Sequence, residues 1–353
     1  MSTESAPSLA DLGGWPFILG RLVGGEDLGS AEASAALSEI LAGAATSAQI
    51  AAFAVSLRMK GETVEEMTGL VRTMLAHAEV VPVPAELDVV DTCGTGGDRS
   101  RSVNVSTMAA LVVAGAGARV CKHGNRAMSS LAGSADVLEA LGVVIDLGPG
   151  AVLRCIEQAG MGFCFAPRFH PALRHAGPTR RELGVATVFN FLGPLANPAR
   201  PRRQVVGVSN PAMAHKMLGV LEANGATHAM VVYGHDGLDE LTTTTTSTMV
   251  ELVDGAVRSV VVDPRGLGLD PATADDLHGG DAGTNAELTR RVLAGEKGPH
   301  RDVVVLNAAA GILAAGLAAD LEEGLSAAER SLDEGRAADV LERLVKTSQE
   351  VAA

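Results

Sequence analysis

Two prolines at alternate positions, Pro82 and Pro84, separate two parts of the chain that differ in hydrophobic periodicity. Before them, residues 15–78 repeat apolar side chains at spacings of three and four, which is typical of amphipathic helices. Proline cannot continue a helix, and it favours extended backbone in the residue that precedes it. We therefore predict a small all-helical N-terminal domain over residues 1–80 and a hinge over residues 81–86.

After the hinge, short β-branched runs alternate with helical stretches. The predicted strands cover residues 89–90, 119–121, 143–145, 205–208, 230–233 and 303–306, and predicted helices include 134–141, 151–159 and 212–223. Such alternation is typical of a parallel sheet with crossover helices. We therefore predict a larger α/β domain over residues 87–353 with a mainly parallel central sheet.

Two segments depart from this alternation. Residues 165–201 contain six prolines and interrupt the strand and helix pattern for more than thirty residues, as functional loops often do. Residues 242–248 form a hydroxyl-rich run with high β-propensity, and Asp254-Gly255 downstream is a hairpin-turn signal. We predict an antiparallel excursion at that point.

The overall composition limits the classes of partner. A chain of 353 residues with 47% hydrophobic content exceeds the usual single-domain size, and its net charge of -14 gives no general attraction to nucleic acid or anionic membranes. The four cysteines lack CxxC spacing, which favours reduced thiols in a cytoplasmic protein over a zinc site. No secretion signal and no membrane-spanning run are expected.

A glycine-rich run at residues 91–98 follows the first predicted strand. Gly94 and Gly97 permit close backbone approach to phosphate oxygens, and Asp98 ends the run. The position at the carboxyl end of a strand is the one expected of a phosphate-binding loop. The run matches neither GxGxxG nor the P-loop, so a glycine turn without a ligand is the alternative.

A short basic run follows another predicted strand, where Lys122 and Arg126 flank His123. Such runs are most often solvated surface patches. Here the run also contains a flexible glycine and an amide, and it precedes a stretch of small residues that supplies hydroxyls and exposed amides; these residues are Gly124, Asn125, Ser129, Ser130 and Ser134. A loop of this composition can close over a pyrophosphate.

Two further groups suit a metal-bound phosphate. Asn104, Ser106 and Thr107 begin an apolar helix, where position alone favours Ser106 as an N-cap over Ser106 as a magnesium ligand. Asp239 and Glu240 are adjacent carboxylates after a predicted strand. Such a pair is commonly just solvated, but near a polyphosphate it offers the hard oxygen ligands that magnesium prefers.

Arg180 lies in a second basic run inside the proline-rich segment. An arginine fork can bind a carboxylate through two hydrogen bonds, although a surface ion pair is the commoner role of a single arginine. His123, His175 and His235 are candidates for acid–base chemistry, but their spacing forms neither a triad nor a metal site.

Taken together, these motifs resemble the anthranilate phosphoribosyltransferases. Enzymes of this family transfer phosphoribose from phosphoribosyl pyrophosphate (PRPP) to the amine of anthranilate in tryptophan biosynthesis. The resemblance covers nearly the whole chain, and its carriers are residues 91–98, 104–107, 122–130, 178–184, 189–195, 237–241 and 307–309.

The resemblance implies a nucleoside phosphorylase-like phosphoribosyltransferase fold in which part of residues 166–198 joins the helical domain. It also implies a cytoplasmic homodimer formed through that domain, with PRPP and anthranilate as ligands and without a nucleic-acid or membrane partner. Thr179, Ala186 and Ala196 depart from the family's commonest residues, which are valine, arginine and threonine. These departures bear on anthranilate entry and dimer contacts.

The resemblance also assigns site residues. Those implied to bind PRPP are Gly94, Gly97, Asp98, Ser102, Asn104, Ser106, Thr107, Lys122, His123, Gly124, Asn125, Arg126, Ser129, Ser130 and Ser134. Those implied to bind anthranilate are Gly94, Asn125 and Arg180. Ser106, Asp239 and Glu240 would hold magnesium, as two ions, and the catalytic residues would be Lys122, Asp239 and Glu240.

Two other functions are compatible with this fold. A pyrimidine nucleoside phosphorylase shares the architecture and binds phosphate with a glycine loop, but residues 122–127 and the acidic pair fit the transferase better. A nucleic-acid-binding relative without catalysis should be basic, whereas this chain is acidic.

Overall fold

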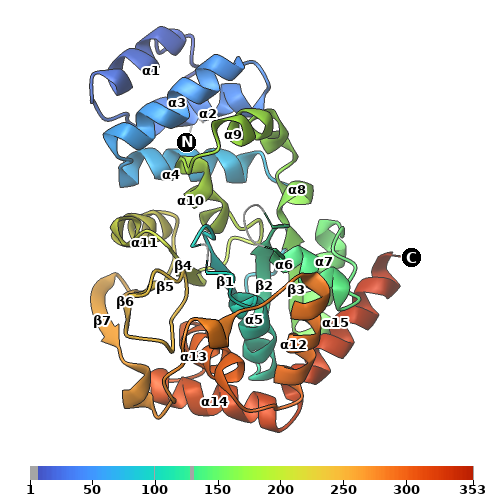
Figure 1. Cartoon of the computed structure of the whole chain (residues 1–353). Helices are drawn as coiled ribbons and strands as arrows, with labels where there is room; N and C mark the ends of the chain where they lie inside the picture. The colour runs from blue at the N-terminus through green and yellow to red at the C-terminus, as the bar shows by residue number, and fades with distance from the viewer. Residues whose placement is uncertain (1–6, 99, 128–130, 353) are drawn as a thin grey trace.

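The computed structural model describes residues 7–98, 100–127 and 131–352. An all-helical part lies at one end of the molecule, helices near the C-terminus lie at the opposite end, and the central sheet lies between them (Figure 1). Within these described ranges, no helix is both long and apolar enough to cross a bilayer.

The chain begins with four helices, two of which start at capping boxes. They are α1 (Gly14–Val23), α2 (Ser30–Leu41), α3 (Ser47–Lys60) and α4 (Val64–Ala76). The side chains of Thr46 and Thr63 accept hydrogen bonds from the first turns of α3 and α4. Helices α2 and α4 cross so closely that a Cβ atom on Gly69 would lie 2.3 Å from the carbonyl oxygen of Ser30.

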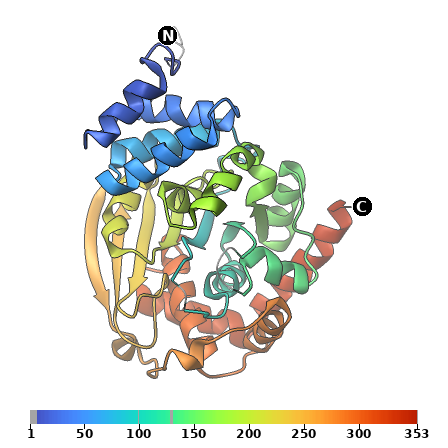
Figure 2. The same ribbon diagram turned by 45° about the horizontal axis from the view of Figure 1, so that its top comes forward.

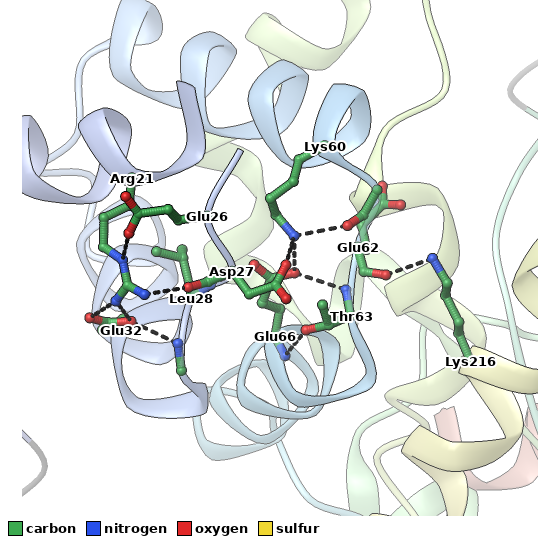
Figure 3. Close-up of polar contacts among 12 residues, drawn as sticks. Arg21, Glu26, Asp27, Leu28, Glu32, Lys60, Glu62, Thr63, Glu66 and Lys216 are labelled. Atoms are coloured by element: carbon green, nitrogen blue, oxygen red, sulfur yellow. Dashed lines mark hydrogen bonds and ion pairs between the residues drawn. The ribbon is translucent and has the colours of Figure 1, made fainter. Parts of the chain in front are cut away.

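A buried ion pair between Lys60 and Glu66 connects the loop between α1 and α2 to the junction of α3 and α4 (Figure 3). The Glu66 carboxylate accepts hydrogen bonds from the backbone amides of Leu28 and Thr63, each at 2.8 Å, and from Lys60 Nζ at 3.0 Å. Lys60 also donates to Asp27 at 2.7 Å. Because these contacts come from separate segments, the pair fixes their relative positions.

The proline-rich segment is helical rather than an irregular loop. It forms α8 (Ala166–Phe169), α9 (Gly177–Leu183) and α10 (Val188–Leu195), with a 3₁₀ helix at Pro171–His175. Three of these elements have proline in their first turn, where the missing N–H is not needed. Helices α9 and α10 pack against α3 and α4, as both views show (Figures 1 and 2).

The central sheet has seven strands in the order β3-β2-β1-β4-β5-β6-β7. They are β1 (Val89–Gly94), β2 (Arg119–Gly124), β3 (Met161–Phe165), β4 (Arg203–Gly207), β5 (His228–Gly234), β6 (Ser247–Val253) and β7 (Ala256–Val262). Neighbouring strands from β3 to β5 in this order pair in parallel. Strand β6 pairs antiparallel with both β5 and β7. The predicted fold class is confirmed, and the hairpin turns at Asp254-Gly255 as predicted.

Three strand predictions are wrong. Residues 143–145 lie outside any strand, and residues 242–246 form a loop in which Thr242 donates to the Asp236 carboxylate at 2.8 Å. Residues 303–306 lie inside α13 (Pro299–Ala314), which is buried on nearly every side. A fully buried helix and a buried strand give the same continuous apolar run, so periodicity does not separate them. Strand β3 was not predicted.

Helices cover both faces of the sheet. The remaining helices are α5 (Val105–Gly115), α6 (Ser134–Ala140), α7 (Pro149–Ala159), α11 (Ala214–Ala223), α12 (Ala282–Leu293), α14 (Leu321–Asp333) and α15 (Arg336–Ala352), with 3₁₀ turns at Pro211–Met213, Pro264–Leu267 and Asp275–Leu277. On β4, Val205 joins the core that contains α5 and α13, whereas Val206 joins the core shared with α10, α11 and the N-terminal helices. The helical part is therefore continuous with one face of the sheet.

Helix α11 makes the polar contacts of that joint. Lys216 Nζ donates to the carbonyl oxygen of Glu62 at 2.7 Å, a contact visible in Figure 3. On α4, the Arg72 guanidinium donates to the carbonyl oxygen of Ala223 at 2.7 Å.

Candidate active site

The candidate site lies where the carboxyl ends of β1 and β4 meet. From β1 the chain adds β2 and β3 on one side of the sheet, and it then adds β4 and β5 on the other side. The strand order therefore reverses between β1 and β4, and ligands of open α/β sheets bind at such a reversal, outside the carboxyl ends of the strands. Gly94 and Gly207 end these strands and pair with each other. A Cβ atom on Gly94 would lie 2.7 Å from Asp239 Oδ2, and one on Gly207 would lie 1.7 Å from the Asp239 carbonyl oxygen. The two glycines therefore allow the acidic segment to cross the strand ends.

The glycine loop after β1 is held against the same acidic segment. Gly96 and Gly97 have φ angles of 65° and 83°, a left-handed conformation that favours glycine. The Gly96 amide donates to Asp239 Oδ2 at 2.6 Å, and the Thr95 amide donates to the Gly207 carbonyl oxygen at 2.9 Å. The predicted loop and the predicted acidic pair thus form one unit.

Lys122 is 1% exposed and points from β2 toward β1 and α5. Its ammonium group donates to the carbonyl oxygen of Thr92 and, at 3.2 Å, to Ser106 Oγ. Ser106 is not the N-cap that its position favoured, since α5 begins at Val105 and Asn104 precedes it. The Ser106 hydroxyl is instead part of the site.

Three carboxylates gather near this lysine. Burial, followed by repulsion from Asp98, raises the pKa of Asp239 to about 7. Burial and then the charge of Asp239 raise the pKa of Glu240 well above its usual value, while Lys122 and the Ser106 amide lower it. The local acids outnumber the lysine, so binding of a cation would relieve their repulsion.

These residues fit magnesium by their chemistry. Carboxylate oxygens and a hydroxyl oxygen are hard ligands, and magnesium is bound by one or two carboxylates together with substrate phosphates rather than by a complete protein cage. Among the residues that the structure describes, no three His, Cys, Asp or Glu side chains form a ready-made metal site.

The resemblance implies a PRPP-binding role for His123, but its side chain lies in the core. Its side chain is buried against the proline-rich segment, with Nδ1 3.1 Å from the Gly193 carbonyl oxygen and its ring 5.3 Å from that of His170. Burial lowers the pKa of His123 to about 3, so the imidazole is neutral. The side chain is thus a core group, and only its backbone lies along the basic run.

The rest of the basic run lies beside the start of α6. The Gly124 position has no room for a side chain, because a Cβ atom there would lie 2.2 Å from Ser134 Oγ. Arg126 is paired with Asp136 at 2.9 Å and Glu139 at 2.8 Å, so its guanidinium is already engaged. Asn125 is exposed and accepts the Arg126 amide. Ser129 and Ser130 lie outside the described residues.

The polar residues before α5 connect the glycine loop to α12. Asn104 donates to the Ala132 carbonyl oxygen at 3.1 Å and accepts from Asn285 at 2.8 Å. Ser102 forms a β-bridge with His278. Thr107 points into the core and is 1% exposed, so its side chain is not available to a ligand.

Arg180 lies in α9, in the part of the proline-rich segment that packs on α3. Its guanidinium carbon is 5.4 Å from the centre of the Phe189 ring, and burial lowers the pKa of Arg180. Among the described residues, no carboxylate pairs with it. A half-buried guanidinium beside an aromatic ring suits a ligand that carries both a carboxylate and a ring.

Comparison with known proteins identifies the family. Residues 17–78 match the model of the glycosyl transferase family helical bundle domain, and residues 86–338 match that of its a/b domain. A curated relative from Rhodococcus jostii, named anthranilate phosphoribosyltransferase, is 56% identical over 344 residues, or 96% of this chain and 94% of the relative. The chain belongs to the anthranilate phosphoribosyltransferase family.

Solved structures of anthranilate phosphoribosyltransferases have the same fold. The Thermus thermophilus structure is 42% identical, covers 94% of this chain and 99% of its own, and has a TM-score of 0.89. A Saccharomyces cerevisiae structure in complex with PRPP and Mg is 26% identical, covers 95% and 98%, and has a TM-score of 0.86. The resemblance inferred from the sequence motifs is confirmed, and the transferase is favoured over the phosphorylase and nucleic-acid-binding alternatives.

Several residues of this anthranilate phosphoribosyltransferase site were not predicted. Gly207 ends a strand that was predicted correctly, but its need to lack a side chain follows only from the approach of Asp239. Asn285 lies far along the chain from its partner Asn104. The signal for such residues in the sequence is an amide side chain among mostly apolar neighbours, such as Asn197 or Gln204. A buried amide needs hydrogen-bond partners, so such a residue marks a polar contact inside the fold.

Proposed function

We propose that this chain transfers the 5-phosphoribosyl group of PRPP to the amine of anthranilate, giving N-(5-phosphoribosyl)anthranilate and pyrophosphate in tryptophan biosynthesis. The observation that carries the proposal is the packing of Asp239 over the paired glycines Gly94 and Gly207, next to Lys122 and Ser106. That arrangement combines a phosphate-binding loop with carboxylates for a metal. The names of the relatives supply the two substrates.

In this proposal the pyrophosphate of PRPP lies along the strand ends. Its donors would be backbone amides of Gly94 and Gly97, the polar residues before and within the start of α5, and the basic run after β2; these include Ser102, Asn104, Ser106, Gly124, Asn125 and Ser134. The Arg126 side chain is paired with acidic residues and the side chains of His123 and Thr107 are buried, so these three residues are left out of the donor set.

Ser106, Asp239 and Glu240 would hold magnesium, and we propose two ions because Asp98 adds a third carboxylate to the group. Bound magnesium would neutralise charge on the departing pyrophosphate. Lys122 would add a fixed positive charge at the same place, and a fixed charge needs no reorganisation as the sugar–oxygen bond breaks. These groups would therefore stabilise the transition state more than the bound substrate.

Anthranilate would lie between the glycine loop and α9, in contact with Gly94, Asn125 and Arg180. Arg180 would pair with its carboxylate, and Phe189, at 5.4 Å from the guanidinium, would face its ring. An aromatic amine is already neutral at pH 7, so no strong base is needed, and orientation of the amine toward the anomeric carbon does most of the work. The neutral, buried His123 agrees with this.

We further propose that residues 81–86 act as a hinge between a helical domain, comprising residues 1–80 and part of 166–198, and an α/β domain over residues 87–353. A homodimer formed through the helical domain is supported by large apolar side chains that it exposes, namely Phe17, Val23 and Met59. The four free cysteine thiols support a cytoplasmic enzyme.

The decisive experiment follows the loss of anthranilate fluorescence after PRPP is added, with and without magnesium. Magnesium-dependent loss of the signal and release of pyrophosphate are expected. Binding of PRPP without consumption of anthranilate would contradict the proposed function. Phosphorolysis of thymidine without added magnesium would support a nucleoside phosphorylase instead.

A further inference from the structure

Strands β1 and β2 separate before they end. Each pairs with its outer neighbour up to its last glycine, β1 with β4 through Gly94 and β2 with β3 through Gly124. With each other they pair only at Val89 and Val90 of β1. The polar backbone groups of β2 beyond that point therefore lack the ladder partners that a parallel sheet would give them, although buried backbone groups require partners.

Two side chains take the place of the missing ladder. Asp91 Oδ1 accepts the His123 amide at 3.1 Å, and Asn197 Nδ2 donates to the Cys121 carbonyl oxygen at 2.8 Å. The same Asn197 nitrogen donates to Asp91 Oδ2 at 2.8 Å, so the two side chains are joined across the gap. The Asn197 amide is held in this orientation because its Oδ1 accepts the Ala199 amide at 2.8 Å.

Asp91 and Asn197 form a bracket that holds the backbone on both sides of Lys122. Its preceding carbonyl is held by Asn197 and its following amide by Asp91, so its backbone is fixed on both sides. Its side chain crosses the same gap to the Thr92 carbonyl oxygen and to Ser106. The position of the ammonium group therefore depends on the bracket.

Asp91 and Asn197 are themselves rigidly held. Asp91 is 0% exposed, and Gln204 Nε2 contacts its Oδ2 at 3.3 Å while donating to the Pro194 carbonyl oxygen at 2.6 Å. The His123 imidazole contacts the carbonyl oxygen of Gly193. The turn after α10 is thus held to the strand ends by several buried side chains. This turn places Asn197 in the gap between β1 and β2.

We propose that Asp91 and Asn197 are positioning residues for the reaction, which hold β1 and β2 apart and place Lys122 against the pyrophosphate of PRPP. They touch neither substrate and act through Lys122. The inference rests on the proposed function for the identity of the ligand. Small displacements of a catalytic group are costly, so loss of the bracket should weaken PRPP binding and turnover but not anthranilate binding.

The test compares Asn197→Ala and the isosteric Asn197→Asp with Ser331→Ala, a control that removes one buried hydrogen bond, from Ser331 to the Val112 carbonyl oxygen, far from the site. The PRPP dissociation constant is measured by calorimetry with magnesium, and KM for each substrate and kcat by fluorescence. Circular dichroism checks that each variant is folded.

Both Asn197 variants should raise the KM and dissociation constant of PRPP by on the order of ten- to a hundredfold and lower kcat, with an unchanged KM for anthranilate. Ser331→Ala should change none of these. Equal changes in both KM values, or a loss of thermal stability with unchanged kinetics, would overturn the proposal. So would failure of both Asn197 variants to fold while Ser331→Ala folds, because the role would then be structural. If wild-type protein binds PRPP but leaves anthranilate unchanged, the proposed function fails and the calorimetry still tests the bracket.

Discussion

Replacing Asp239 with asparagine should stabilise the magnesium-free protein at neutral and higher pH while it abolishes turnover. Burial and the nearby Asp98 raise the pKa of Asp239 from 3.8 to about 7. A carboxyl group with a raised pKa in the folded state binds more protons when folded than when unfolded, so stability falls as the pH rises from 3.8 to about 7. Asparagine does not ionise, and its oxygen can still accept the Gly96 amide that Asp239 binds at 2.6 Å.

The expected magnitude follows from this pKa difference. Each pH unit well between the two pKa values corresponds to ~1.4 kcal/mol, and Asp239 is half ionised at pH 7. The stability of Asp239→Asn relative to wild type should therefore increase by about 2 kcal/mol from pH 5 to pH 7 and level off above pH 7. For a chain of 353 residues that unfolds in one transition, this is a shift of roughly 3 °C in Tm.

The assay is thermal unfolding followed by circular dichroism at pH 5, 6, 7 and 8 in the absence of magnesium. The matched control is Glu86→Gln, which removes an exposed carboxylate from the connection between the two parts of the chain. Its stability relative to wild type should not vary over this pH range. A difference between Asp239→Asn and wild type that is constant with pH, or that decreases as pH rises, would refute the reasoning. Magnesium with pyrophosphate should stabilise the wild type more than the variant.

Three other substitutions test separate parts of the structure. Arg180→Ala should raise the KM for anthranilate far more than the KM for PRPP in steady-state assays, and equal increases would exclude the proposed pairing with the anthranilate carboxylate. Gly207→Ala should lower kcat by on the order of a hundredfold because its Cβ atom would lie 1.7 Å from the Asp239 carbonyl oxygen; unchanged turnover would show that this approach is not required. Glu66→Ala should lower the free energy of unfolding by ~3–5 kcal/mol in urea titrations, since Lys60 loses a buried partner and two amides lose their acceptor. A loss below ~1 kcal/mol, typical of a surface pair, would contradict the importance of that ion pair.

The fold could be predicted from the sequence where local signals agree with one another. The change of periodicity at the prolines, the β-branched runs before glycines, and the Asp254-Gly255 turn all correspond to observed elements. Prediction failed where burial removed the signal, as in α13, whose run at residues 303–306 is apolar on every side. It also failed at residues 242–246, where threonine hydroxyls bind Asp236 instead of extending the strand.

The site was predicted as separate motifs, and the structure shows how they are related. The glycine loop and the acidic pair are far apart in sequence, yet Gly96 and Asp239 share a hydrogen bond of 2.6 Å. Position at the ends of parallel strands was enough to bring them together, because those ends meet at one edge of a sheet. The His123 side chain points into the core, and a basic run does not reveal which of its side chains does so.

Asp91 and Asp98 illustrate what a motif alone leaves undetermined. Both are carboxylates of one glycine-rich run, and either could be assigned to the metal by residue type. Asp91 lies on the strand, where its side chain must point to one face of the sheet, and that face carries Asn197 and Gln204. Asp98 lies beyond the strand, in the loop, and interacts with Asp239. The distinction depends on where β1 ends, which is Gly94, a position where a Cβ atom would lie 2.7 Å from Asp239 Oδ2 of the acidic segment that completes the site.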